Sequence, residues 1–111
     1  MAGEIILRGD TLGDTPRAVL DVRGSVAGKI QSISSDTTLD DRYSTVLVDT
    51  SGSIDVTVTL PAASGCRGRM YNLKLVDATN SLIIEGNGSD TVEGAASLTV
   101  WGLNDCVTLQ S

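Results

Sequence analysis

Hydrophobic and polar residues alternate most clearly between Ile54 and Leu60. Isoleucine, valine and leucine occupy every second position there, while aspartate and threonine occupy the positions between them. A period of two places all the apolar side chains on one side of an extended chain, which predicts a β-strand with one buried face. Pro61 follows and is expected to end the strand, because proline has no N–H to donate to a ladder.

Five further segments after residue 44 show a similar pattern. Strands are predicted over residues 45–49, 70–76, 81–85, 97–101 and 105–110. Residues 49–52 contain turn-forming Asp, Ser and Gly, so the strands on either side of them are expected to form a hairpin. Residues 86–89 contain Asn-Gly, which is the strongest hairpin signal in the chain. No segment has a convincing helical period, and residues 38–43 are the best candidate for a single helical turn.

Short strands separated by turns at intervals of about ten residues predict an all-β fold, either a small antiparallel β-sandwich or a compact barrel. The core is expected to be aliphatic, because the chain has no Phe, one Trp and two Tyr. Valine, isoleucine and threonine favour strands over helices. A chain of 111 residues is long enough for one core, and we assign residues 36–111 to this domain.

The first 35 residues have a different pattern. Glycines and a proline separate two short groups of apolar residues: Ile5, Ile6, Leu7, Val19, Leu20 and Val22. Neither group has a local partner of matching length, so we predict residues 1–35 to be an extended N-terminal arm. Such an arm can add a strand to the sheet edge of a neighbouring subunit. Two extra strands of the same domain remain the alternative.

The charge of the chain limits its partners. The net charge is −6 and there is no His, and an acidic surface repels phosphate, so we expect no nucleic-acid partner. Neither a leader peptide nor an apolar run of membrane-spanning length is found, and we expect no membrane partner. In a reducing cytoplasm Cys66 and Cys106 are expected to be free thiols, although a bond formed after release from the cell remains open.

The sequence contains few of the residues that catalytic sites use. There is no His, and neither Cys has a base partner, so the apparatus for nucleophilic catalysis is missing. Residues 49–52, Asp-Thr-Ser-Gly, resemble the Asp-Thr-Gly loop of aspartic proteases, but Ser51 stands where that family has glycine. A turn explains the same residues. We predict no enzymatic activity, no cofactor and no small-molecule substrate.

Oxygen-bearing side chains that suit calcium are spread over two predicted turns: Asp77, Asn80, Asn87, Asp90 and Glu93. Calcium requires six to eight oxygen ligands around one point. Because Asp and Asn are also the residues that turns use, we predict no metal site.

From about residue 35 onward the chain resembles a recurrent module of bacteriophage virions. The stretches that carry the likeness are residues 45–52, 56–63, 72–77, 84–91 and 107–110. Their order and spacing resemble domains of tail fibres, tail spikes, head fibres and head decoration proteins. The resemblance implies a structural or adhesive piece that works as a trimer.

On this resemblance we expect a capsid decoration (cement) protein, assembled in the host cytoplasm and placed on the capsid surface. Its partners would be the major capsid protein and two sister copies in a homotrimer. The chain begins with Met1 and ends just after the last predicted strand, so a long stalk is expected to be absent, which favours decoration. The alternatives are a tail fibre, spike or other attachment protein that binds a host glycan, and an unrelated carbohydrate- or protein-binding domain.

The scarce aromatic residues are candidates for subunit contacts, because aromatic side chains often anchor interfaces. Alternation along residues 97–101 places Trp101 on the face opposite Leu98 and Val100, outside the core. We predict an interface made by Tyr71, Trp101 and the six apolar residues of the arm. Stacking on sugars is the other role that these rings could have.

Overall fold

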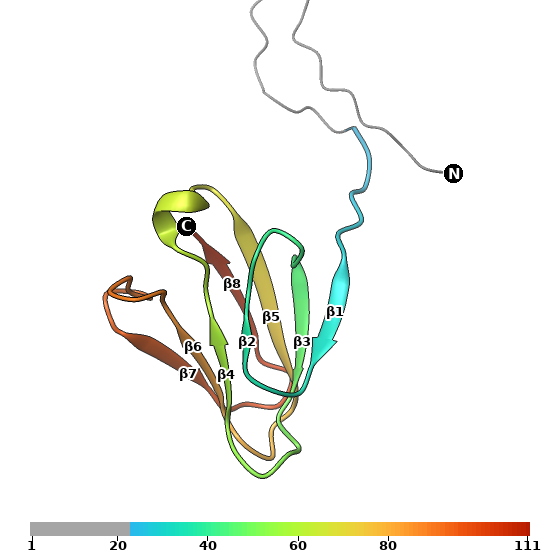
Figure 1. Ribbon diagram of the computed structural model, residues 1–111. Coiled ribbons are helices and arrows are strands. Elements are labelled where there is room, and N and C mark those ends of the chain that lie inside the picture. Colours follow the sequence, from blue (N-terminus) through green and yellow to red (C-terminus); the bar gives the residue numbers. More distant parts are fainter. Residues whose placement is uncertain (1–22) are drawn as a thin grey trace, which may run out of the picture.

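The computed structural model describes residues 23–111 and contains two four-stranded sheets (Figure 1). The strands are β1 (Ile30–Ile33), β2 (Thr37–Thr38), β3 (Thr45–Asp49), β4 (Val56–Thr59), β5 (Met70–Asp77), β6 (Leu82–Glu85), β7 (Ser97–Val100) and β8 (Cys106–Gln110). The order in the first sheet is β1-β3-β5-β8, and in the second sheet it is β2-β4-β6-β7. Between β4 and β5 lies a short 3-10 helix, η1 (Ala63–Gly65).

The chain crosses from one sheet to the other after each strand from β1 to β5 (Figure 1). Each return to a sheet runs in the same direction, so β1, β3 and β5 are parallel neighbours, and so are β2, β4 and β6. The last two strands reverse this direction: β7 pairs antiparallel with β6, and β8 pairs antiparallel with β5. The fold is therefore a flattened coil of three turns, followed by one antiparallel strand in each sheet.

The prediction of a β-rich fold is confirmed, but the prediction of antiparallel sheets is wrong, since both sheets are mixed. The segment expected to close a hairpin at residues 49–52 instead carries the chain from the first sheet to the second. A hairpin turn and such a corner use the same residue types, so local composition does not distinguish them.

Helical structure is minor in the described part of the chain. At the expected helical turn the Tyr43 N–H donates to the Asp40 carbonyl at 3.3 Å, but only a turn forms at residues 41–42. None of the helices within residues 23–111 has the length and apolar character needed to cross a bilayer.

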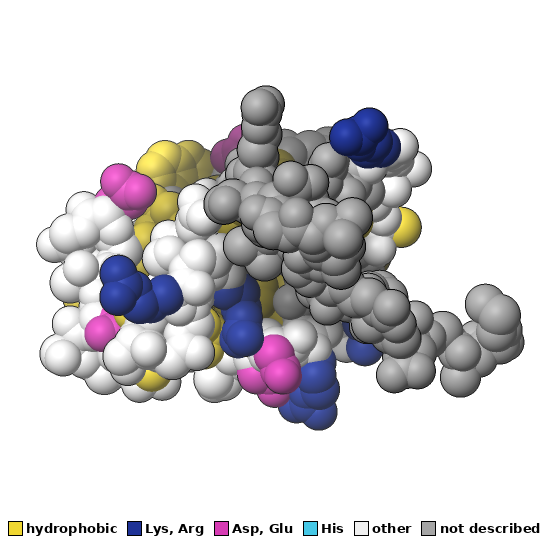
Figure 2. Space-filling view, turned by 90° about the horizontal axis from the view of Figure 1, so that it is seen from above, with side chains coloured by type: hydrophobic (Ala, Val, Ile, Leu, Met, Phe, Trp, Pro, Cys, Tyr) yellow, Lys and Arg dark blue, Asp and Glu magenta, His cyan; other side chains and the backbone are white. Residues whose placement is uncertain are grey.

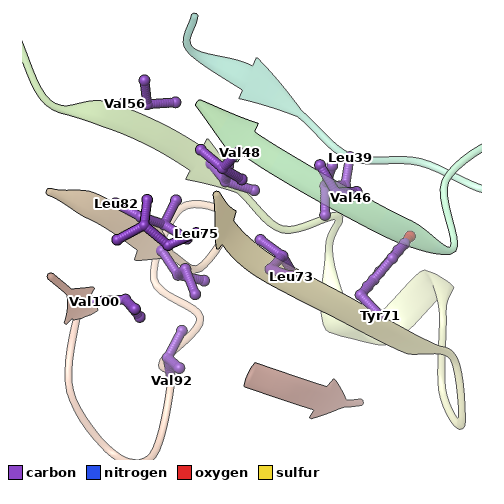
Figure 3. Packing of buried hydrophobic residues seen from close by; sticks show 12 residues of the cluster. Leu39, Val46, Val48, Val56, Tyr71, Leu73, Leu75, Leu82, Val92 and Val100 are labelled. Atoms are coloured by element: carbon purple, nitrogen blue, oxygen red, sulfur yellow. The ribbon is translucent and has the colours of Figure 1, made fainter. Parts of the chain in front are cut away.

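The inward faces of both sheets form one aliphatic cluster, in which side chains from the two layers face each other (Figure 3). On β5 the alternating residues Tyr71, Leu73 and Leu75 are 3%, 0% and 0% exposed. Val58 and Ile84 of the second sheet are also fully covered. Burial alternates along β3, β4, β5 and β6, as the period of two predicts.

Ile54 corrects one detail of the predicted pattern. It was expected to share the buried face of the strand over residues 54–60, but it is 71% exposed. The strand begins only at Val56, so Ile54 lies in the corner that leads from β3 into β4.

Thr50 joins two corners of the coil. Its side chain is fully buried, and its Oγ1 lies 2.6 Å from the Asp77 carbonyl oxygen and 2.7 Å from that of Asn80. The Asn80 side-chain amide donates to the carbonyls of Thr50 at 2.9 Å and Gly52 at 2.7 Å. These bonds connect the corner after β3 to the corner after β5, which holds successive turns of the coil in register.

Replacing Thr50 with valine is expected to lower the free energy of unfolding by about 1–3 kcal/mol, because a methyl group cannot donate to the buried carbonyls. Urea denaturation measures the loss. The matched control is Thr57→Val on β4, a half-buried position, which is expected to change stability by no more than about 0.5 kcal/mol. Equal effects of the two substitutions would contradict the role given to Thr50.

The first described strand begins at residue 30. β1 lies within the 35 residues assigned to the arm, and it pairs in parallel with β3 over four positions. Residues 23–29 before it are exposed throughout. The Lys29 carbonyl still accepts the Thr45 N–H at 3.0 Å, and the chain before it leads away from the sheets (Figure 1). The predicted contact residues of the arm lie outside the described residues: Ile5, Ile6, Leu7, Val19, Leu20 and Val22.

Candidate interaction surface

A groove of about 260 Å³ opens between β7 and β8, the last strands of the two sheets. We call it the end groove. Its lining consists of Leu98, Thr99, Val100, Trp101, Asp105, Cys106 and Val107. In the described part of the chain, each of these two strands has a paired neighbour on one side only. The end groove therefore lies where both sheets end.

The floor of the end groove is the edge of the hydrophobic core. Leu98 stands in register with Ile84, and Val107 with Leu73, so both point inward like their buried partners. Ile84 and Leu73 are 0% exposed, whereas Leu98 and Val107 remain half-buried. The apolar layer is thus incompletely covered at this end, which is a common property of surfaces that bind another chain.

Within residues 23–111, one side of β8 also has backbone groups without a strand partner. The Leu75 N–H donates to the Asp105 carbonyl at 2.9 Å, and the Ser111 N–H donates to the Arg69 carbonyl at 3.1 Å. Bonding alternates along an antiparallel pair, so residues 105, 107, 109 and 111 direct their backbone groups toward β5. The residues whose N–H and C=O point to the open side are Cys106, Thr108 and Gln110.

Trp101 stands at the rim of the end groove, directly after β7, and it is 72% exposed. The structure thus places it outside the core, as alternation predicts. Leu103, in the same connection to β8, is 62% exposed. The corner between β3 and β4, which carries exposed Ile54, lies at the same end of the molecule as the connection between β7 and β8 (Figure 1). Three large apolar side chains are therefore displayed at this end.

Tyr71 does not lie on this surface. Its ring belongs to the core and is 3% exposed, and its hydroxyl donates to the Asp40 carbonyl at 2.8 Å. The reason is its position on β5, in register with inward-facing Leu109. A ring that is already covered within its own chain has little area left for a partner. Among the described residues predicted to lie at an interface, Trp101 is the one that is exposed.

Charged groups are dispersed on one face of the molecule (Figure 2). On the face shown in Figure 2, Lys and Arg side chains lie apart from one another, among acidic and uncharged residues. Arg42 Nη2 lies 2.7 Å from Asp40 Oδ2, and this hydrogen bond lowers the pKa of the Asp40 carboxyl and raises the pKa of the Arg42 guanidinium. Both side chains are open to solvent, Arg42 more than Asp40, and an exposed pair of this kind contributes little to stability.

The protease-like loop acts as a corner. Asp49 Oδ1 accepts the Ser51 N–H at 2.8 Å, and hydrogen bonds from the Ser51 side chain and backbone lower the pKa of the Asp49 carboxyl. Asp77, which stands in register with Asp49 on β5, accepts hydrogen bonds from the N–H and hydroxyl of Thr79 at 2.9 and 2.7 Å. A catalytic dyad shares one proton and raises the pKa of one carboxyl, whereas each of these carboxylates is engaged in its own turn.

Three of the five residues considered for calcium, Asp77, Asn80 and Asp90, have side chains engaged in local structure. Asn80 belongs to the corner network, and Asp90 Oδ2 accepts the Ala63 N–H at 2.9 Å. Within residues 23–111, no three His, Cys, Asp or Glu side chains gather closely enough to hold a metal ion. Both cysteines are free, with Cys66 buried and Cys106 exposed.

The end groove and the free side of β8 could not be located from the sequence. Alternation predicts that Leu98 and Val107 face inward. It does not show that β7 and β8, which carry them, are the last strands of their sheets. Comparison with known protein families, with curated proteins and with solved structures found no match to this chain. The function of the chain is therefore inferred from its residues and from their geometry.

Proposed function

We propose that this protein is a bacteriophage capsid decoration (cement) protein, which binds the head shell as a homotrimer and stabilises it. The observation that carries the proposal is the end groove, where an apolar floor and a strand edge that has no paired neighbour within residues 23–111 lie beside exposed Trp101. Unpaired edges and uncovered apolar surface drive association with other chains. The phage setting is supported by the resemblance of residues 45–110 to virion modules.

The proposed mechanism is reinforcement by many identical contacts. A standard specific interface buries roughly 1,200–2,000 Å², and an arm of the proposed kind adds area that a small domain lacks. In this proposal the two sheets act as the layers of a compact β-sandwich, and the arm reaches the major capsid protein or a sister subunit. Trimer formation covers sheet edges that otherwise favour uncontrolled pairing.

One observation favours the alternative of a tail fibre or spike. β1, β3 and β5 stack in parallel, as do β2, β4 and β6. Coils of this kind are the unit from which extended β-solenoids are built. In that alternative Trp101 would stack on a host glycan.

The ratio of this protein to the major capsid protein in purified phage particles distinguishes a decoration protein from a tail fibre or spike. The decoration proposal predicts hundreds of copies per particle, whereas a tail component is present in a handful. Absence from mature particles would overturn both. A glycan array supplies the second comparison, since specific sugar binding that is lost in Trp101→Ala would favour the attachment protein over the shell protein.

A further inference from the structure

We infer that the end groove of one subunit receives the arm of a neighbouring copy, with residues 18–22 lying along β8 as an added strand. This inference rests on the proposed self-association and specifies its contact. It does not depend on the proposed attachment to a capsid.

The end groove has the size and chemistry of a receptor for apolar side chains. Its volume of about 260 Å³ exceeds the roughly 150 Å³ of an engineered apolar cavity that binds benzene. Leu98 and Val107 form a floor that is only half-buried in the described part of the chain. Along its side, alternate residues of β8 present backbone N–H and C=O groups to an incoming strand. Strand addition uses such backbone bonds for affinity and the side-chain pockets for specificity.

Residues 18–22, Ala-Val-Leu-Asp-Val, suit this position. In an extended conformation Ala18, Leu20 and Val22 share one face, and Val19 and Asp21 share the other. The first face would cover the floor of the end groove, while Asp21 would remain in solvent on the outer face. The segment has five residues, and so has β8.

The direction of the chain favours a neighbouring copy over the same subunit. Residues 23–29 are exposed throughout, and the chain before residue 28 leads away from the sheets (Figure 1). β1, to which they connect, and β8 stand at opposite edges of the first sheet. Seven residues, 23–29, link β1 to this segment and can span up to about 25 Å when extended, which is enough to reach a subunit that packs directly against this one. Contacts that run from each arm to the next groove are head-to-tail, and such contacts form a trimeric ring when the rotation from one copy to the next closes after three subunits.

Direct pairing of β8 with β8 of a second copy is the main competing arrangement. It would satisfy the free backbone groups of both strands. The inward side chains of the second β8, such as Leu109, are packed against their own core, so they would not fill the groove. An inserted arm would bind the free backbone groups of β8 and would also cover the floor of the end groove.

Trp101 reports on occupancy directly, because it is the single tryptophan of the chain and lines the end groove. The full chain carrying Leu20→Asp and Val22→Asp is expected to leave the groove empty. Adding a synthetic peptide of residues 15–24 should then shift Trp101 emission to shorter wavelength with saturable binding. A peptide that carries the same two aspartates is the matched control. If both peptides give the same response, the arm is not the ligand of the groove.

Cross-linking distinguishes a neighbouring arm from the subunit's own arm. Asp21→Cys and Val19→Cys place a thiol on the expected outer face, where exposed Cys106 also lies. Mild oxidation of the full-length variants should yield covalent dimers and trimers that disappear when Cys106→Ser is added. Disulfides confined to single chains, or no Cys106-dependent product from either variant, would overturn the exchange between copies. Both experiments use the isolated protein, so their failure leaves the particle copy number unaffected as a test of the proposed function.

Discussion

Replacing Leu73 with alanine is expected to lower the free energy of unfolding by about 2–5 kcal/mol. Leu73 is 0% exposed on β5, the strand that separates β3 from β8 in the first sheet. Its side chain packs where the apolar faces of the two sheets meet (Figure 3). Truncation removes buried methyl groups and leaves a cavity that an aliphatic core cannot fill without moving strands.

Domains of this size are stable by only about 5–15 kcal/mol, so the Leu73→Ala variant should show a markedly lower urea midpoint. The control is Lys74→Ala, one residue further along the same strand on the outer face, for which a change within about 0.5 kcal/mol is expected. A loss below about 1 kcal/mol for Leu73→Ala would show that the two sheets do not share one core as described.

Replacing Trp101 with alanine is expected to weaken self-association by at least about 30-fold without unfolding the domain. Central aromatic anchors of an interface typically contribute about 2 kcal/mol or more, and each 1.4 kcal/mol corresponds to roughly a tenfold change in the dissociation constant. Because Trp101 is 72% exposed in the single chain, its removal costs little internal packing. Sedimentation velocity over a concentration series measures the dissociation constant, and circular dichroism reports on the fold.

The control for Trp101 is Thr57→Ala on the second sheet, away from the end groove, which is expected to leave association unchanged. If Trp101→Ala and Thr57→Ala associate equally well, the end groove is not where the subunits meet.

The strands themselves were largely predictable. A period of two is a local property of the sequence, and it located the strand at residues 45–49 and, to within one or two residues, those from β4 to β8. The error at Ile54 arose where alternation continued into an exposed corner. Trp101 lies outside the core because the same alternation reverses the side on which it projects after Val100.

Strand pairing was not predictable from these patterns. Alternation specifies which face of a strand is buried, but not which strand lies beside it. The turn residues at 49–52 are compatible with a hairpin and with a crossing to the second sheet, and the crossing produces parallel neighbours. The corner network of Thr50 and Asn80, which joins residues thirty positions apart, leaves no local signal in the sequence.

The two aromatic residues predicted to lie at an interface, Tyr71 and Trp101, differ in burial for a similar reason. Scarcity suggested that Tyr71 contacts a partner, but its face of β5 also carries Leu73 and Leu75, and burial within the chain takes precedence. The end groove arises because β7 and β8 each lack a second paired neighbour within the described residues. Such an absence is a property of the assembled sheets, which no single strand encodes.

The central claim is that this chain works by binding copies of itself. Light scattering on the purified full-length protein at micromolar concentration tests it most directly, because it reports mass without assuming shape. The account predicts a mass near three times the 11.5 kDa of one chain. A single species at 11.5 kDa over the whole concentration range would contradict it.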